Sequence, residues 1–259
     1  MAVALAASFA SDTLTAQATT GPRPDVVRPS SIGLDYTYQN FRGDIDPWHL
    51  VALTAGRRTS RGSIIGRINY ADRFASDGVQ VEADAYPRLG DGLYAYLNLG
   101  YSRASIFPGW RSGAELFGSL PHAYEASLGY RQLRFGGPPV TLLTGSVGKY
   151  VGNHWFSLRP YIRSKATGTS GSASFTARRY FQDGDNWLGG RIGVGSTPGD
   201  QLVQDQTDRT SSFGASIQGS RTVQASLVGT WSAGYDSEQL GPRRARTSLT
   251  VSTGLKYLF

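Results

Sequence analysis

The last thirteen residues of the chain, 247–259, read TSLTVSTGLKYLF and alternate in polarity. One set of alternate positions is mostly apolar and ends in Leu255, Tyr257 and Phe259, whereas the other set is mostly small or polar. Successive side chains of a β-strand point to opposite faces, so this pattern predicts a strand whose two faces meet different solvents. The stretch is also long enough to cross a bilayer at the usual tilt. We therefore expect a transmembrane β-strand, with an edge strand of a soluble sandwich as the alternative.

Overall composition restricts how such a chain could cross a membrane. Apolar residues make up only 39% of the 259 residues, and no run approaches the roughly 20 consecutive apolar residues that a membrane helix needs. A closed barrel is the other structure that satisfies every backbone hydrogen-bonding group in hydrocarbon. In a barrel strand apolar and polar residues alternate, so the mean hydropathy stays low, here −0.29, although one face is apolar. The sequence therefore predicts an all-β, closed antiparallel transmembrane β-barrel.

Period-two segments separated by turn residues continue along most of the chain. We expect about 14 strands, with 12–16 tolerated, because bacterial barrels of this kind have even strand numbers. In the fourth strand Val79, Val81 and Ala83 alternate with Glu82 and Asp84. The expected strands are 32–41, 48–57, 64–70, 79–86, 93–102, 112–119, 122–135, 140–150, 154–165, 172–181, 187–196, 211–219, 222–235 and 247–259.

The connections between these segments form two sets. If the chain starts in the periplasm, alternate links should be tight periplasmic turns, and the opposite links should be longer outside loops. The expected turns are 60–62, 89–92, 120–121, 151–153, 183–186 and 220–221. The opposite set is 42–47, 104–111, 166–171, 197–209 and 237–244, with 76–78 and 136–139 as short exceptions.

Three regions follow from this pattern. Residues 1–18 contain small apolar residues and an A-x-A site at 16–18, so we expect a signal peptide. No Lys or Arg precedes its apolar run, so we expect the start codon to lie further upstream. Residues 19–30 are proline-rich and predict a short periplasmic leader. Residues 31–259 form the expected outer-membrane barrel.

Several ordered motifs carry a resemblance to a known family. They are NYADRF at 69–74, EADAYPR at 82–88, YAYLNLGYS at 94–102, GAELF at 113–117, EASLGYRQLRF at 125–135 and TGSVGKYVGNHWFSLRP at 144–160. Together they resemble the YaiO family of outer-membrane β-barrel proteins, over about 32–259. The resemblance implies a barrel in the outer membrane of a Gram-negative envelope, and it brings no substrate or catalytic residue with it. The terminal Leu255, Tyr257 and Phe259 also resemble the signal that the outer-membrane insertion machinery recognises.

Charged residues within the strands should face the lumen, because a charge on the lipid face near the midplane costs ~2–4 kcal/mol. In one interpretation these residues, Glu115 among them, pair with one another and fix the barrel. In the other interpretation, Arg groups contact carboxylates or phosphates of a solute while aromatic faces guide sugar rings. The candidate lumen-facing solute contacts are Arg67, Glu82, Asp84, Tyr86, Tyr94, Tyr96, Glu125, Arg131, Trp155, Arg159, Tyr161, Arg163 and Arg191.

A lipid-modifying enzyme is the rival class. The histidines are His49, His122 and His154, and a Ser three residues from a His on a strand faces the other way. Local Ser–His pairing is therefore excluded, whereas a pair from different strands stays open. Glu82 and Asp84 share a face, but neighbouring Arg residues make an ion-paired role more plausible than proton sharing. We expect no catalytic residues, no metal site and no cofactor.

The absence of Cys excludes disulfides and thiolate chemistry. The formal charge of +7 raises the question of which anionic partners the protein binds. The Lys and Arg residues are scattered rather than clustered, so we expect no nucleic-acid binding. The surplus positive charge instead indicates attraction to lipopolysaccharide or to an anionic solute. The sequence thus predicts an outer-membrane barrel that passes a small or saccharide-like solute, with a non-conducting structural or surface-interaction barrel as the alternative.

Overall fold

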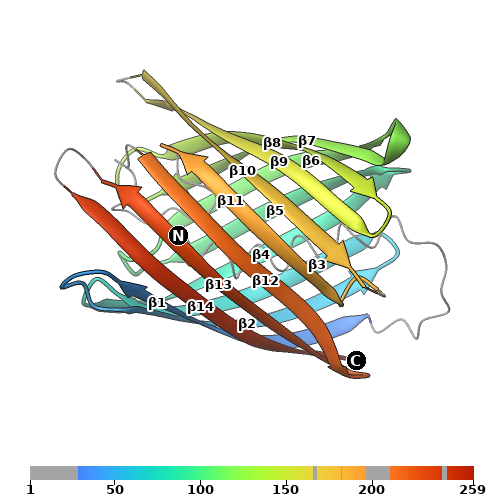
Figure 1. Cartoon of the computed structure of the whole chain (residues 1–259), viewed down its shortest axis with the longest axis horizontal. Helices are drawn as coiled ribbons and strands as arrows, with labels where there is room; N and C mark the ends of the chain where they lie inside the picture. Colours follow the sequence, from blue (N-terminus) through green and yellow to red (C-terminus); the bar gives the residue numbers. More distant parts are fainter. Residues whose placement is uncertain (1–28, 166–167, 182, 197–210, 241–243) are drawn as a thin grey trace.

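The computed structural model shows a closed barrel of fourteen antiparallel strands (Figure 1). It describes residues 29–165, 168–181, 183–196, 211–240 and 244–259. The expected signal peptide, most of the expected leader and the expected outside loop 197–209 lie outside the described residues. No helix among the described residues is long and apolar enough to span a membrane.

Each strand pairs with its neighbours in sequence, and the last strand closes the barrel against the first. β1 and β14 pair from Ser31 opposite Leu258 to Phe41 opposite Ser248. The backbone amides of Ser30 and Phe259 also donate to each other's carbonyl oxygen, both at 3.0 Å. The strands are β1 (Ser30–Phe41), β2 (Trp48–Thr59), β3 (Gly62–Arg73), β4 (Ser76–Gly90), β5 (Leu93–Ser102), β6 (Trp110–Leu120), β7 (Tyr124–Arg134), β8 (Val140–Val151), β9 (His154–Lys165), β10 (Gly168–Tyr180), β11 (Trp187–Gly195), β12 (Ser211–Gln224), β13 (Leu227–Gln239) and β14 (Ala245–Leu258). The predicted number of strands is confirmed.

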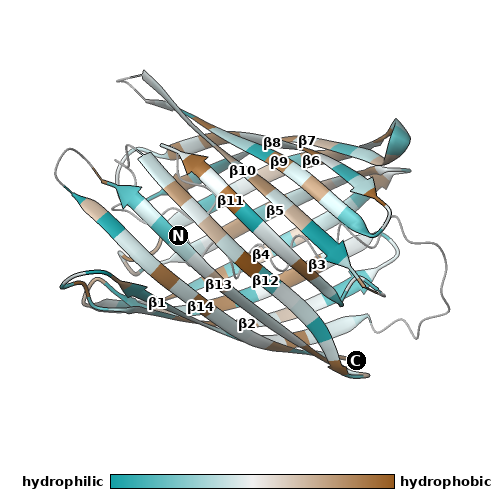
Figure 2. Ribbon diagram, in the orientation of Figure 1, coloured by the Kyte–Doolittle hydropathy of each residue, from teal (hydrophilic) through white to brown (hydrophobic). Residues whose placement is uncertain are grey.

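The outer face of the wall is apolar. Along β14, residues at odd positions from Leu249 to Tyr257 are exposed, whereas those at even positions from Ser248 to Gly254 are buried. Among the large apolar side chains of the described residues, Leu128 in the middle of β7 has the largest exposed fraction, at 76%. Apolar and polar positions alternate along the tilted strands (Figure 2). Hydrocarbon is the solvent that suits such an exposed apolar band, so the wall is built to sit in a bilayer.

Several connections lie where the sequence pattern did not place them. β10 begins at Gly168, inside the expected loop 166–171. The β3–β4 turn falls at Phe74 and Ala75 rather than at 76–78, and both residues have positive φ. The expected seventh strand began at 122, but residues 121–123 form a 3-10 turn, so β7 begins at Tyr124. The expected turn at 220–221 is wrong. β12 keeps pairing with β13 there, with Arg221 opposite Gly229, and turns only at 225–226.

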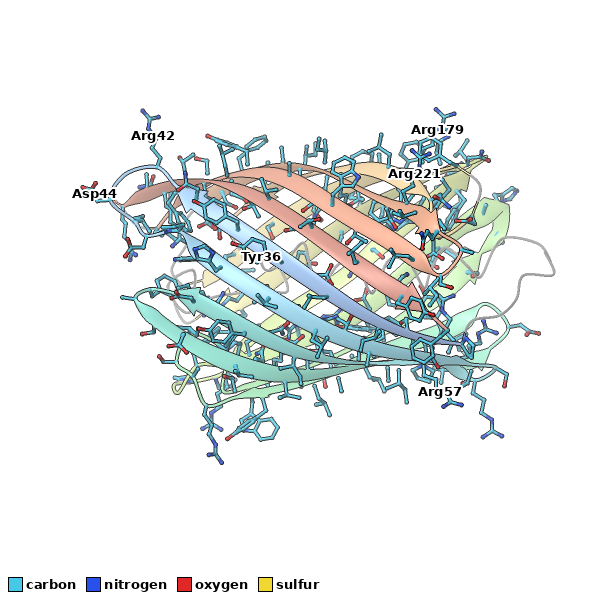
Figure 3. The ribbon with its side chains drawn as sticks, turned by 90° about the horizontal axis from the view of Figure 1, so that it is seen from below. Tyr36, Arg42, Asp44, Arg57, Arg179 and Arg221 are labelled. Carbon is cyan, nitrogen blue, oxygen red and sulfur yellow. The ribbon has the colours of Figure 1, made fainter. Side chains whose placement is uncertain are left out.

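Connections of the two sets lie at opposite ends of the barrel. Figure 3 shows Arg42 and Asp44 at one end, which we call the loop end. Arg57, Arg179 and Arg221 lie at the other end, which we call the terminus end because strand β1 starts there and β14 finishes there. Most turns at the terminus end are short, as predicted, but the β10–β11 connection between Tyr180 and Trp187 is as long as the loop-end link 42–47. Loop-end links include the longer segments 42–47 and 103–109 as well as the short turn at 74–75.

Candidate functional site: the inner wall of the barrel

Ion pairs dominate the inner wall on strands β3 to β6. Arg67 Nη1 donates to Glu82 Oε2 at 2.8 Å, and its Nη2 lies 3.3 Å from Asp84 Oδ2. Arg111 Nη1 donates to the other oxygen of Glu82 at 2.8 Å. Asn98 Nδ2 donates to Asp84 Oδ1 at 2.6 Å, so both carboxylates have partners from neighbouring strands. These side chains are all buried, so removing one partner would leave a buried charge without its counter-charge.

A second set of ion pairs is centred on Glu115 of β6. The carboxylate accepts from Arg131 Nη2 of β7 at 2.6 Å and from Arg159 Nη1 of β9 at 2.7 Å. Ser127 Oγ donates to the same carboxylate at 2.5 Å. The Arg131 guanidinium also lies 4.6 Å from the centre of the Tyr96 ring, a cation–π contact. We call the two sets together, Arg67, Glu82, Asp84, Arg111, Glu115, Arg131 and Arg159, the ion-pair cluster.

Glycines on the same face make room for these guanidinium groups. A Cβ at Gly100 would lie 2.6 Å from Arg111 Cγ, and a Cβ at Gly113 would lie 2.6 Å from Arg131 Cδ. Atoms this close must shift, so a larger residue at either position would displace the arginine. The lack of a side chain at Gly100 and Gly113 therefore leaves the space that Arg111 and Arg131 occupy.

Aromatic side chains border the ion-pair cluster. Tyr94 stacks on Phe117 with ring centres 4.7 Å apart, and its hydroxyl donates to Glu125 at 3.2 Å. Tyr86 and Tyr96 have ring centres 5.2 Å apart, and the Tyr96 hydroxyl donates to Asp84 at 3.1 Å. Two of the predicted tyrosines, Tyr94 and Tyr96, thus contact predicted carboxylates.

A loop folds inward at the loop end. Ile106 and Phe107 of the segment 103–109 are buried against Leu50 and Ala71, which are inner residues of β2 and β3. Arg73 lies over the Phe107 ring at 4.6 Å and near the Trp48 ring at 6.0 Å. Arg246 lies 5.0 Å from Trp48 and pairs with Glu238 at 2.7 Å. We call Trp48, Arg73, Phe107, Glu238 and Arg246 the collar.

The terminus end has a cationic group of its own. Arg178 is buried and lies 3.8 Å from the Trp187 ring centre and 5.6 Å from that of Trp155. Lys256 pairs with Asp185 at 2.9 Å in the β10–β11 connection. Arg178 is thus held by two aromatic faces of the inner wall.

Between these two ends, one side of the inner wall carries small residues. Along β12, β13 and β14 the buried inner positions include Gln218, Ser232, Thr250 and Ser252. Thr37 of β1 continues this side, and its hydroxyl hydrogen-bonds Ser252 at 2.8 Å. We call this side the hydroxyl face and define it by the inner residues Thr37, Ser174, Thr176, Gly193, Gly214, Ser216, Gln218, Thr230, Ser232, Gly234, Ser248, Thr250 and Ser252. Charged side chains also point inward from these strands, among them Asp35 beside Thr230 and Arg191 beside Ser174.

All thirteen predicted lumen residues occupy inner positions of their strands. Arg67, Glu82, Asp84, Tyr86, Glu125, Arg131, Trp155 and Tyr161 are buried, and Tyr94, Tyr96, Arg159, Arg163 and Arg191 are half-buried. Most of the carboxylates and arginines among them pair as one interpretation of the sequence predicted. Whether any of them contacts a solute stays a prediction.

Several inner residues were missed because their segments were assigned to loops. Arg111, Glu238 and Arg246 fell in or beside the expected loops 104–111 and 237–244. Arg111 and Glu115 are four residues apart, and that even spacing was the available signal for a shared face. Arg178 was missed although it alternates with Ser174 and Thr176 on β10.

The histidines lie away from the ion-pair cluster. His49 is half-buried and hydrogen-bonds the Tyr36 hydroxyl at 2.8 Å, and Tyr36 is on the exposed side of β1. His122 is in the exposed 3-10 turn, and His154 is exposed at the start of β9 while Ser157 is buried on the other face. Within the described residues, no group of three or more His, Asp or Glu side chains could hold a metal ion.

The C-terminal residues lie on the outer face. Leu255, Tyr257 and Phe259 have exposed fractions of 55%, 49% and 59%. The Tyr257 and Phe259 rings stack with centres 6.0 Å apart. The predicted alternation is therefore confirmed, whereas recognition by the insertion machinery stays a prediction.

Comparison with solved structures supports the same architecture. The chain is similar to a CymD monoaromatic hydrocarbon channel, with a TM-score of 0.59, 10% identity, and coverage of 89% of this chain and 88% of that chain. It is similar to a bacterial polysaccharide outer membrane secretin, with a TM-score of 0.58, 7% identity, and coverage of 91% and 100%. For the outer membrane protein Omp33 of Acinetobacter baumannii the TM-score is 0.52 at 10% identity, with coverage of 89% and 98%. At these identities the likeness shows the fold alone.

Comparison with sequence families is more specific. No curated protein matches the sequence. The model of the YaiO membrane beta barrel domain matches residues 29–200, which covers β1 to β11 and ends before β12. The match spans most of the chain and agrees with the apolar outer wall and the closed strand order. The chain therefore belongs to the YaiO family of membrane β-barrels and is an outer-membrane protein.

Proposed function

We propose that the barrel is a passage for small polar or saccharide-like solutes across the outer membrane. The observation that carries the proposal is the division of the inner wall into two unlike sides. The ion-pair cluster ties strands β3 to β9 together, whereas the hydroxyl face on β10 to β14 and β1 carries short side chains and glycines. Short hydroxyl-bearing side chains leave space along a wall and can exchange hydrogen bonds with a polar solute.

Both ends of this face carry groups suited to a polar solute. The collar at the loop end combines two guanidinium groups with aromatic rings, and Arg178 lies among aromatic rings at the terminus end. Aromatic faces stack against sugar rings, and guanidinium groups bind carboxylates or phosphates. The order of groups along the barrel therefore supports entry, passage and exit of a hydrophilic molecule.

A non-conducting barrel is the second candidate. The inward loop 103–109 and the dense ion-pair cluster favour it, because both fill space inside the wall. In that case the cluster would serve only to stabilise the barrel.

Solute uptake into liposomes separates the two candidates. Purified protein in liposomes should admit glucose, measured as osmotic swelling. Replacing Ser216 with Trp puts a large side chain on the hydroxyl face and should slow swelling, whereas Ile217→Trp on the lipid face of the same strand should not. Folded protein that admits no glucose, or equal swelling rates for the two variants, would contradict the passage.

A further inference from the structure

Carboxylates are absent from one quarter of the barrel wall. Strands β9, β10, β11 and β12 contain neither Asp nor Glu. They do contain the inner residues Arg159, Arg163, Arg178 and Arg191. The strands that carry the carboxylates of the ion pairs, such as Glu82 and Glu115, lie elsewhere around the barrel. Positive charge on this quarter is therefore not balanced by acidic groups on the same strands.

The strand register places three of these arginines next to a row of hydroxyl-bearing side chains on β10. The inner positions of β10 hold Ser170, Ser172, Ser174 and Thr176. On one side of β10, Arg159 lies opposite Ser174 and Arg163 lies opposite Ser170. On its other side, Arg191 of β11 lies opposite Thr176. Directly paired residues have Cβ atoms about 5 Å apart, so the arginines border the hydroxyl line closely.

Arg191 is the arginine best placed to receive an external partner. Its Nη2 donates to Ser174 Oγ at 3.1 Å, and its side chain is half-buried. In the described part of the chain no carboxylate pairs with it. Arg159, by contrast, is engaged by Glu115. A guanidinium bound only to a hydroxyl keeps donors for an anion and costs little to redirect.

We infer that Arg191 and the β10 hydroxyls Ser172, Ser174 and Thr176 form an anion-binding strip, which makes the passage selective for carboxylate- or phosphate-bearing solutes such as sugar acids. The hydroxyls exchange hydrogen bonds with the neutral part of the solute, and the Arg191 guanidinium holds its charge. This inference rests on the proposed passage and specifies its substrate class. Positive charge in a narrow, low-dielectric path raises the local concentration of anions.

Charge selectivity of the reconstituted barrel tests the strip. In a planar bilayer with a KCl gradient, the reversal potential should show preference for chloride over potassium, and liposomes should admit D-glucuronate faster than D-glucose. These two sugars share a ring and differ at the C6 carboxylate. Changing Arg191 to Gln should lower the chloride preference by about two- to threefold, and Arg191→Glu should lower it further.

Arg179→Gln is the matched control. It removes the same charge from the same strand pair, but Arg179 is exposed on the outer side, so the selectivity should stay at the wild-type value (Figure 3). Heat-dependent mobility on a gel should show that each variant is folded. Passage of glucose without preference for glucuronate, or equal loss in the Arg179 and Arg191 variants, overturns the strip and leaves the passage standing. A folded wild-type barrel that passes neither ions nor sugars overturns both.

Discussion

Arg159 of β9 donates to Glu115 of β6 at 2.7 Å, across the two intervening strands β7 and β8. Arg131 of β7 donates to the other oxygen of the same carboxylate. One side chain therefore links three strands that are not all neighbours in the wall. Inside a barrel that lacks a continuous apolar core, such links hold the wall in register.

Removing the Glu115 charge should destabilise the barrel. The side chain of Glu115 is fully buried, so Glu115→Gln leaves Arg131 and Arg159 without their shared carboxylate. Breaking a buried pair in this way costs about 3–5 kcal/mol. Unfolding in denaturant, followed by heat-dependent gel mobility, should show the loss. Asp77→Asn removes a carboxylate from an exposed position and should have little effect, so equal stability of the two variants contradicts the structural role of Glu115.

An arginine on the outer wall should be tolerated far less than one on the inner wall. Leu128 lies at the middle of β7 and faces outward, so Leu128→Arg should destabilise the inserted barrel by about 2–4 kcal/mol. Ser216→Arg, at an inner position of β12, should cost much less. Folding yield in lipid vesicles measures the difference. A higher yield for the Leu128 variant would reverse the assignment of the two faces.

Loosening the collar should widen the path at the loop end. Phe107 is buried and lies under the Arg73 guanidinium, so Phe107→Ala removes packing that holds the inward loop. Loss of a buried phenylalanine typically costs about 3–5 kcal/mol, enough to free a short loop. Single-channel conductance should rise. Ile45→Ala in the exposed 42–47 loop is the control, and an unchanged conductance in the Phe107 variant would show that the loop does not restrict the path.

The terminal aromatic residue should matter more for assembly than for the finished wall. Phe259→Ala leaves all ladder pairs of β14 in place, because the β1–β14 register ends at Leu258 and the bonds between Phe259 and Ser30 are made by the backbone. We expect less barrel in the outer membrane of expressing cells. Leu249→Ala, on the same face of the same strand, should assemble normally. Equal membrane levels of the two variants would exclude an insertion signal at Phe259.

Strand number, wall polarity and the inner position of the charged residues could be predicted because each depends on a period of two. Alternation along 247–259 and 79–86 is written directly in the sequence. Turn positions were harder, because Phe74, Ala75, His122 and Ala123 have positive φ without being Gly. Such residues give no local turn signal, since left-handed backbone is usually occupied by Gly or Asn.

Pairing inside the barrel depends on information that the sequence pattern does not carry. Glu238 and Arg246 meet only because β13 and β14 extend further than their apolar alternation does. Likewise, Arg159 and Glu115 are far apart in the chain and meet across the two intervening strands β7 and β8. The alternation was therefore enough to predict which residues of a strand face inward. Predicting the partner of an inward residue required the register of every intervening strand.

Ion current through purified protein in a planar lipid bilayer tests the central claim most directly. The account predicts discrete current steps from the folded wild-type barrel, which Ser216→Trp reduces and Ile217→Trp leaves unchanged. A folded, inserted barrel that carries no current at any applied voltage would contradict the passage and leave the ion-pair cluster with a structural role only.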